Sequence, residues 1–117
     1  MIKNNNLNLI KIIVEINSEN YKEITSQTEK PVLIDFYAEW CGPCKMLHST
    51  MEKLAEEFGD SVIIAKVNIE DNMDISVEHA IMSIPAVVVF NKGQVVGNKI
   101  IGAASKDTYT NILKELV

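Results

Sequence analysis

Cys41 and Cys44 are the only cysteines in the 117 residues, and two residues separate them within the motif WCGPC (40–44). A Cys-x-x-Cys pair can form a structural disulfide, supply half of a metal site or act as a redox couple. Thiol–disulfide exchange needs a thiolate that attacks one sulfur of a disulfide and a second thiol that resolves the mixed disulfide. The spacing suits this redox chemistry.

The two cysteines are expected at the first turn of a helix, and this position assigns their roles. Unpaired N–H groups at a helix N-terminus stabilise negative charge, which favours a thiolate at Cys41. Cys44 lies about one turn further along and is expected to point inward. We therefore predict that Cys41 is the nucleophile and Cys44 the resolving thiol. Pro43 restricts the backbone between them, and Gly42 leaves room for a substrate chain.

Two other uses of the cysteine pair agree less well with the sequence. A structural disulfide across so short a loop would remove little chain entropy. A zinc site could combine Cys41 and Cys44 with His48, four residues after Cys44, and with His79. The histidines lack zinc-finger spacing and Cys44 should face the core, so we expect no metal.

Asp35 interrupts a nearly continuous apolar run, VLIDFYA (32–38), which is typical of a strand covered on both faces. Burial makes a carboxylate costly and raises the pKa of the acid. A buried acid near Cys44 could take up and return the proton that resolution requires; the alternative is a solvated strand-edge position. Lys66 is either its partner across the sheet or a lysine whose stem extends from a strand end.

The segment SIPA (83–86) predicts a tight turn before a strand, for which a cis bond between Ile84 and Pro85 is plausible. The Ile84 backbone would then lie beside the sulfurs and could pair with an extended substrate. Trp40, at the strand-to-helix turn, is expected to form a partly exposed ledge beside the reactive sulfur. Its alternative role is simple packing.

The elements that must position these residues follow from hydrophobic periodicity and turn residues. Strands are predicted at 11–16, 32–38, 62–69, 86–90 and 94–101, with NKG (91–93) marking a hairpin between the last two. Helices are predicted after an N-cap at Ser18 to about residue 28, over 44–58 and 74–80, and after an N-cap at Ser105. This order predicts an α/β fold whose mixed sheet carries helices on both faces.

Composition limits the function further. The chain is expected to form one domain over 1–117, with 1–10 as a polar lead. Its formal net charge is −5, and its eleven lysines form no basic stripe, so nucleic acid is an unfavoured partner. Asparagines and a lysine interrupt the apolar residues near the N-terminus, so we expect neither an export signal nor a membrane span.

Four segments in the same order resemble the thioredoxin family, in particular bacterial-type members with WCGPC: DFYAEWCGPCK, AKVNIEDN, SIPAVVVFNKGQVV and IIGAASK. The resemblance implies the thioredoxin fold, a central mixed five-stranded β-sheet flanked by four α-helices. It implies a general protein-disulfide reductase that binds no cofactor, with Asp35 as the proton-transfer carboxylate and Lys66 as its neighbour. It also implies a substrate groove, made of Trp40, Gly42, Pro43, Ile84, cis-Pro85 and Gly102.

The resemblance also implies partners. A NADPH-linked thioredoxin reductase would reduce the protein, which would then reduce clients such as ribonucleotide reductase, peroxiredoxins or methionine sulfoxide reductases. The protein is expected to act as a cytoplasmic monomer, and its Gly-Pro pair resembles reducing members of the family. The alternative function is a thioredoxin-fold binding subunit that supports another protein independently of its thiols.

Three positions depart from the family's pattern. Tyr37 replaces a tryptophan common in bacterial members, Ser49 stands where many have a helix-kinking proline, and Ser83 replaces a frequent glycine. Without that proline the helix over 44–58 keeps an internal hydrogen bond and is expected to be less kinked. His48, beside this position, could tune partner choice or simply face solvent.

Overall fold

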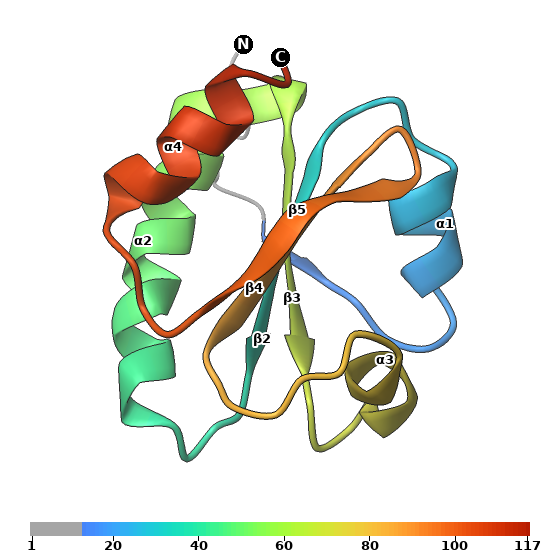
Figure 1. Ribbon diagram of the computed structural model, residues 1–117, viewed down its shortest axis with the longest axis vertical. Helices are drawn as coiled ribbons and strands as arrows, with labels where there is room; N and C mark the ends of the chain where they lie inside the picture. Colours follow the sequence, from blue (N-terminus) through green and yellow to red (C-terminus); the bar gives the residue numbers. More distant parts are fainter. Residues whose placement is uncertain (1–12) are drawn as a thin grey trace, which may run out of the picture.

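The computed structural model describes residues 13–117, in which a five-stranded mixed sheet lies between two pairs of helices (Figure 1). The strands are β1 (Val14–Glu15), β2 (Val32–Tyr37), β3 (Ile63–Asn68), β4 (Ala86–Asn91) and β5 (Gln94–Ile101). The helices are α1 (Tyr21–Ser26), α2 (Gly42–Phe58), α3 (Met73–Glu78) and α4 (Lys106–Lys114). The predicted polar lead and the first two residues of the predicted first strand lie outside the described residues.

The order of strands in the sheet is β1-β3-β2-β4-β5. The first three are parallel, whereas β4 runs antiparallel to β2 and β5 antiparallel to β4. The predicted mixed sheet, with a parallel N-terminal half and an antiparallel final pair, is confirmed. The carboxyl ends of β2 and β3 reach the same edge, the lower one in Figure 1, where β2 continues into α2. The cysteine motif lies at this edge.

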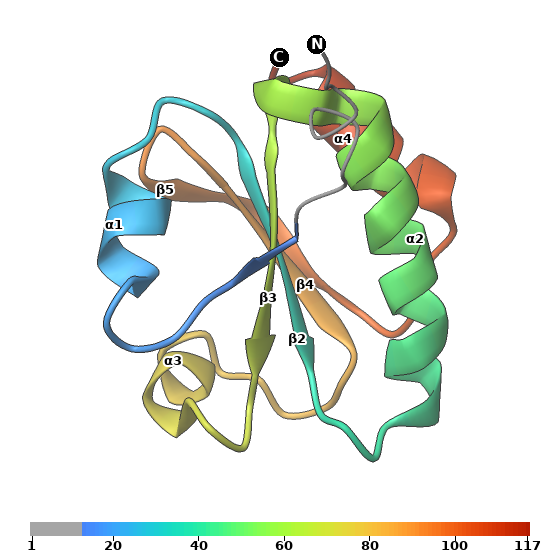
Figure 2. The same ribbon diagram turned by 180° about the vertical axis from the view of Figure 1, so that it is seen from behind.

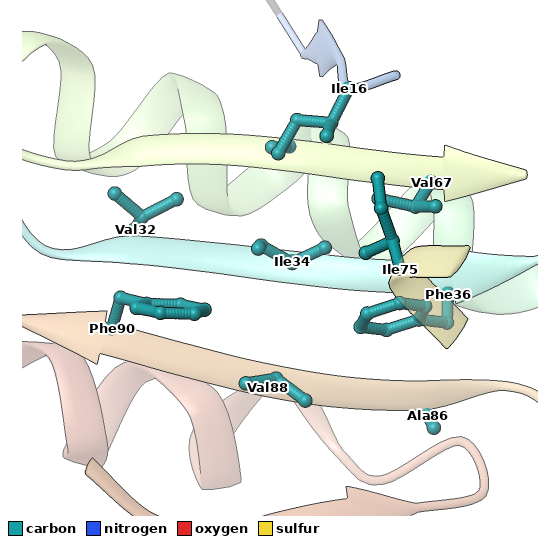
Figure 3. Close-up of a cluster of buried hydrophobic side chains, with 10 residues drawn as sticks. Ile16, Val32, Ile34, Phe36, Val67, Ile75, Ala86, Val88 and Phe90 are labelled. Atoms are coloured by element: carbon teal, nitrogen blue, oxygen red, sulfur yellow. The ribbon is translucent and has the colours of Figure 1, made fainter. Parts of the chain in front are cut away.

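Apolar side chains cover both faces of the sheet, which explains the continuous apolar runs of β2 and β4. Figures 1 and 2 show α2 and α4 on one face and α1 and α3 on the other. One core cluster lies on the α1 and α3 side and includes Ile34, Phe36 and Phe90 (Figure 3). The other lies under α2 and α4 and includes Leu47 and Tyr109. The central strands are thus fixed from both sides.

Three polar side chains lie in one row across the parallel part of the sheet. Asp35 of β2 pairs with Lys66 of β3, and Lys66 pairs on its other side with Glu15 of β1. Directly paired residues point to the same face. Leu33, two positions before Asp35 on β2, packs in the cluster under α2 and α4. The row Glu15, Lys66 and Asp35 therefore belongs to the face that α2 covers.

The helix α2 carries the predicted apolar stripe. Its buried residues are Cys44, Leu47, Met51 and Leu54. It ends at Gly59, whose φ of 52° favours glycine and whose N–H donates to the Ala55 carbonyl. The 17-residue helix continues without a break past position 49, and its expected straightness there stays a prediction. Across residues 13–117, every helix is too short or too polar to cross a bilayer.

The first helix differs from the prediction because Ser18 is not its N-cap. The Asn17 side chain accepts hydrogen bonds from the backbone N–H groups of Glu19 and Asn20, at 2.8 and 3.0 Å. A turn therefore occupies these positions, and α1 begins only at Tyr21. The Ser18 hydroxyl instead donates to the Asp74 carboxylate at 2.8 Å. Ser105 does occupy the N-cap position of α4, although its hydroxyl contacts that of Thr108 rather than a backbone N–H.

The outer strand β5 pairs irregularly with β4. The register shifts between Val87 and Val89 of β4, opposite a part of β5 that contains Gly97 with a φ of 68°. The Lys99 ammonium donates to the carbonyls of His79 and Ala80, at 3.0 and 2.8 Å, directly after α3. The last strand is thereby connected to the end of that helix.

Candidate active site

The two cysteines lie where β2 turns into α2. Cys41 is the N-cap of α2, with extended backbone angles, and its N–H donates to the Ala38 carbonyl at 3.2 Å. Cys41 and Cys44 form a disulfide, with 5.3 Å between their Cα atoms. The N–H of Cys44 donates to Cys41 Sγ at 3.2 Å. An N–H group of the first helical turn is therefore directed at the sulfur that sequence reasoning named as the nucleophile.

The two cysteines differ little in exposure. Cys41 has 5% of its surface exposed and Cys44 has 3%. Cys44 therefore points inward, as expected, and only a small part of Cys41 is accessible to solvent. Beside this part, a side chain added at Gly42 would meet open space, and Pro43 is exposed. The accessible part of Cys41 therefore lies on the side that Gly42 leaves free.

Three of the predicted groove residues come together beside the disulfide. The Ile84–Pro85 bond is cis, as the resemblance implied. The Ile84 side chain packs against the cluster formed by Ala38, Cys41 and Cys44. The N–H of Gly102 donates to the Pro85 carbonyl at 2.8 Å. Residues far apart in the sequence thus meet at one end of the sheet.

Trp40 forms the exposed ledge that the sequence predicted, with 67% of its surface accessible. Its indole Nε1–H donates to Glu70 Oε2 at 3.0 Å. Sequence reasoning missed Glu70, which follows β3 and reaches this edge only because β2 and β3 are parallel neighbours. Each residue comes shortly after the end of a parallel strand, and this was the one signal that could have indicated the contact.

Replacing Glu70 with alanine is expected to free the Trp40 ring. The lost hydrogen bond stabilises the observed ring orientation by about 0.5–1 kcal/mol, so the population of that orientation relative to others should fall about twofold to fivefold. Trp40 is the only tryptophan, so steady-state fluorescence anisotropy measures its motion directly and should decrease. Asp71→Ala, at the exposed neighbouring position, is the control. Equal anisotropy in the parent and Glu70→Ala would contradict this reading.

Asp35 is buried, as predicted. Only 2% of its surface is exposed, and its Oδ1 has no hydrogen-bond partner among the described residues. Burial raises the pKa of the Asp35 carboxyl to about 7, and the nearby positive charge of Lys66 opposes this rise only partly. Asp35 and Cys44 line the same cavity, which has a volume of about 250 Å³. A proton-accepting group is therefore present beside the second cysteine.

Lys66 is next to Asp35 in the sheet, but its ammonium group makes its ion pair elsewhere. Its Nζ lies 3.5 Å from Glu15 Oε1 and 5.3 Å from the centre of the Tyr37 ring. The prediction that Lys66 is the partner of Asp35 therefore needs correction: the backbones are paired, whereas the charged contact is with Glu15. Sequence reasoning missed Glu15, because only the register of β1 against β3 reveals its position.

The two histidines lie too far from one another to complete the zinc site considered above. His79 lies on the other face of the sheet, with its ring 5.7 Å from that of Phe36 and its Nε2 2.6 Å from the Tyr21 hydroxyl. His48 lies on α2, with its Nε2 3.6 Å from Glu52 Oε2. Within residues 13–117, no group of three or more His, Cys, Asp or Glu side chains could hold a metal ion. The histidines and cysteines do not form one site.

Almost the whole chain is similar to known proteins. The thioredoxin family model matches residues 12–115. A thioredoxin from Acidithiobacillus ferridurans is 38% identical over 101 residues, which cover 86% of this chain and 93% of that protein. A solved structure of a mutant thioredoxin from Halobacterium salinarum NRC-1 has a TM-score of 0.81 at 27% identity and covers 91% of each chain.

A third similar chain comes from a structure that concerns "the thiol resolving mechanism in yeast mitochondrial 1-Cys peroxiredoxin via glutathione/thioredoxin systems". Its TM-score is 0.79 at 31% identity, with 89% of this chain and 95% of that chain covered. These similarities confirm the fold class that the sequence predicted.

Proposed function

The chain belongs to the thioredoxin family and is a protein-disulfide oxidoreductase, and from this premise we propose that Cys41 is its attacking thiol and Cys44 its resolving thiol. The observation that carries this assignment is the N–H of Cys44 directed at Cys41 Sγ, 3.2 Å away, at the start of α2. In the reduced protein the same helix N-terminus would stabilise a thiolate at Cys41.

Reduction of a client proceeds in two exchange steps. The Cys41 thiolate attacks one sulfur of the client disulfide; the client S–S bond breaks, a mixed disulfide forms, and the other client sulfur leaves as a thiolate that takes up a proton. Cys44 then gives its proton to Asp35 and attacks Cys41 Sγ, which breaks the bond between Cys41 and the client. The client sulfur leaves as a thiolate and takes up the proton that Asp35 returns. The client leaves with two thiols, and the protein, having given up two electrons, holds the Cys41–Cys44 disulfide.

Asp35 is the acceptor of the Cys44 proton in this proposal. It lines the same cavity as Cys44, and its pKa of about 7 lets it both accept and return a proton near neutral pH. Lys66 contributes as a neighbouring positive charge rather than as a contact of Asp35.

The client is proposed to bind along the groove beside the disulfide. Trp40 supplies an exposed apolar surface, and the open space at Gly42 and Pro43 admits a chain to Cys41. An extended client segment can pair with the backbone of Ile84, next to Pro85 and Gly102. Backbone pairing is independent of client side chains, which suits a reductase of many proteins.

The proposal extends to partners and place of action. A NADPH-linked thioredoxin reductase restores the dithiol, and the clients are disulfide-containing proteins such as ribonucleotide reductase, peroxiredoxins or methionine sulfoxide reductases. Because a reductant of this kind needs a reducing compartment, we place its action in the cytoplasm. It acts as a monomer, without a cofactor or metal of its own, and without binding membranes or nucleic acid.

Replacing Asp35 with asparagine is expected to slow the resolution step about tenfold to a hundredfold near pH 7, because the amide cannot accept the Cys44 proton and solvent water must do so less efficiently. Rapid-quench mass spectrometry of the mixed disulfide with a client measures this step separately from the first attack. Asp107→Asn, on the exposed side of α4, is the control. A resolution rate equal to that of the parent would refute the role of Asp35.

A further inference from the structure

Glu15, Tyr37 and Lys66 form a closed cluster next to Asp35. Tyr37 Oη donates to Glu15 Oε2 at 3.0 Å, and Lys66 Nζ lies 3.5 Å from Glu15 Oε1. The same ammonium lies 5.3 Å from the centre of the Tyr37 ring, a favourable distance for a cation. Glu15 and Asp35 flank Lys66 on either side in the sheet. The two carboxylates therefore compete for one ammonium, and Glu15 holds it.

We propose that Glu15 is a positioning residue for proton transfer, because it keeps the Lys66 ammonium from pairing with Asp35 and so leaves the Asp35 carboxylate basic enough to take up the Cys44 proton. Tyr37 supports Glu15 in this role through its hydroxyl and its ring. The kinetic consequence of this inference rests on the proposed role of Asp35 in resolution, whereas the effect on Asp35 itself does not.

The two carboxylates differ in burial, so the position of the Lys66 ammonium affects them to different degrees. The Glu15 side chain is half exposed, so water stabilises its charge whether or not Lys66 is near. Asp35 is 2% exposed, and a buried carboxylate depends on a direct counter-charge. Moving the ammonium from Glu15 to Asp35 would thus change Asp35 far more than Glu15. In this proposal Glu15 of β1 controls the ionisation of Asp35 of β2 through the position of the Lys66 ammonium.

Other charged or titratable groups also face Asp35, and they limit which substitutions are informative. The groups that line its cavity with it are Tyr37, Glu39, Cys44, Lys45, His48 and Lys66. From α4, Tyr109 is close enough for the charge of Asp35 to contribute to its raised pKa. The β4 neighbour of Asp35 is the apolar Val87. Two of the groups that line the cavity are ammonium groups, those of Lys45 and Lys66. Among the described residues, the ion pair of Glu15 is with Lys66.

The test is an NMR titration of the Asp35 side-chain carboxyl carbon in the oxidised parent, Glu15→Gln, Lys66→Met and the double variant. Glu15→Gln is expected to lower the Asp35 midpoint by about one pH unit, since an opposite charge moving close to a carboxylate favours its ionised form. Lys66→Met should raise the midpoint. In the Lys66→Met background, Glu15→Gln should change it much less. Glu23→Gln, on α1 at the opposite face of the sheet, is the control.

Two results would overturn the proposal. One is an Asp35 midpoint that does not move in Glu15→Gln. The other is an equally large change in the Lys66→Met background, which would mean that Glu15 acts by its own charge and not through Lys66. Tyr37→Phe removes the hydroxyl but keeps the ring, and it should move the midpoint in the same direction as Glu15→Gln by a smaller amount.

The pH profile of the resolution step provides a second readout that a merely structural role would not change. Glu15→Gln is expected to move the midpoint of this profile to lower pH by the same amount as in the titration. If Asp35→Asn leaves resolution unchanged, the proposed relay fails, but the titration still decides whether Glu15 controls Asp35 through Lys66. The two proposals can therefore fail separately.

Discussion

Replacing Cys41 with serine is expected to lower the rate of insulin disulfide reduction by more than about 10³-fold, because a serine hydroxyl is not ionised near neutral pH and cannot form the mixed disulfide. Assays with dithiothreitol or with a matched NADPH-linked reductase as the electron source should agree, since both need the same attacking sulfur. Far-UV circular dichroism should be unchanged, because the substitution removes one sulfur atom from a narrow exposed edge.

Cys44→Ser separates the two cysteine roles. It keeps Cys41, the proposed attacking thiol, so it should form a covalent adduct with the client that dithiothreitol releases, whereas Cys41→Ser should form none. The double variant Cys41→Ser, Cys44→Ser tests the alternative of a binding subunit that acts without its thiols. Complementation of a cell's requirement by this double variant, or insulin reduction by Cys41→Ser at the parent rate, would contradict the assignment.

The stability of the oxidised protein is expected to depend on pH through Asp35. The pKa of this carboxyl is about 7 in the folded protein, and it returns to about 3.9 on unfolding. Between these values the folded state binds the proton that the unfolded state has lost, so the free energy of unfolding falls as pH rises. The stabilisation is fully present below pH 4 and is lost through pH 7, with a total of about 4 kcal/mol.

Urea unfolding of the parent and of Asp35→Asn at several pH values between 4 and 9 measures this dependence. Asparagine has the same shape but no charge, so its contribution is constant over the range, and the slope between pH 4 and 7 should largely disappear in the variant. The comparison of slopes is the decisive quantity, because any constant cost of burying the amide cancels. Asp107→Asn should keep the parent's slope. If the free energy of unfolding of Asp35→Asn depended on pH as steeply as that of the parent, a group other than Asp35 would be responsible.

Much of the fold follows from local patterns. The apolar run around Asp35 indicated a strand covered on both faces, and the stripe from Leu47 to Leu54 indicated the face of α2 that is buried. The hairpin before β5 was evident from its Gly-containing turn. In each case the signal lies within a few residues of the element that it predicts, so no knowledge of the tertiary structure was needed.

The missed features depend on contacts between distant segments or on competition between neighbours. The register of β1 decides that Glu15, not Asp35, holds Lys66, and a strand of two residues carries almost no pattern from which to read a register. The start of α1 depended on whether Asn17 or Ser18 bonded the backbone, and both residue types are suitable. The segment around Pro85 was compatible with a cis bond, but the resemblance was needed to favour it, because most X–Pro bonds are trans.

The irregular pairing of β4 with β5 affects how the molecule should behave in crowded solution. A straight outer strand presents a row of unpaired main-chain groups that a second copy can extend, and this is a route to aggregates. Here the register shift near Gly97 disturbs one border of the sheet, and at the other border β1 comprises two of the residues that the structure describes. Both borders are therefore poor templates for a foreign strand. The protein is therefore expected to resist strand-to-strand association between copies at high concentration.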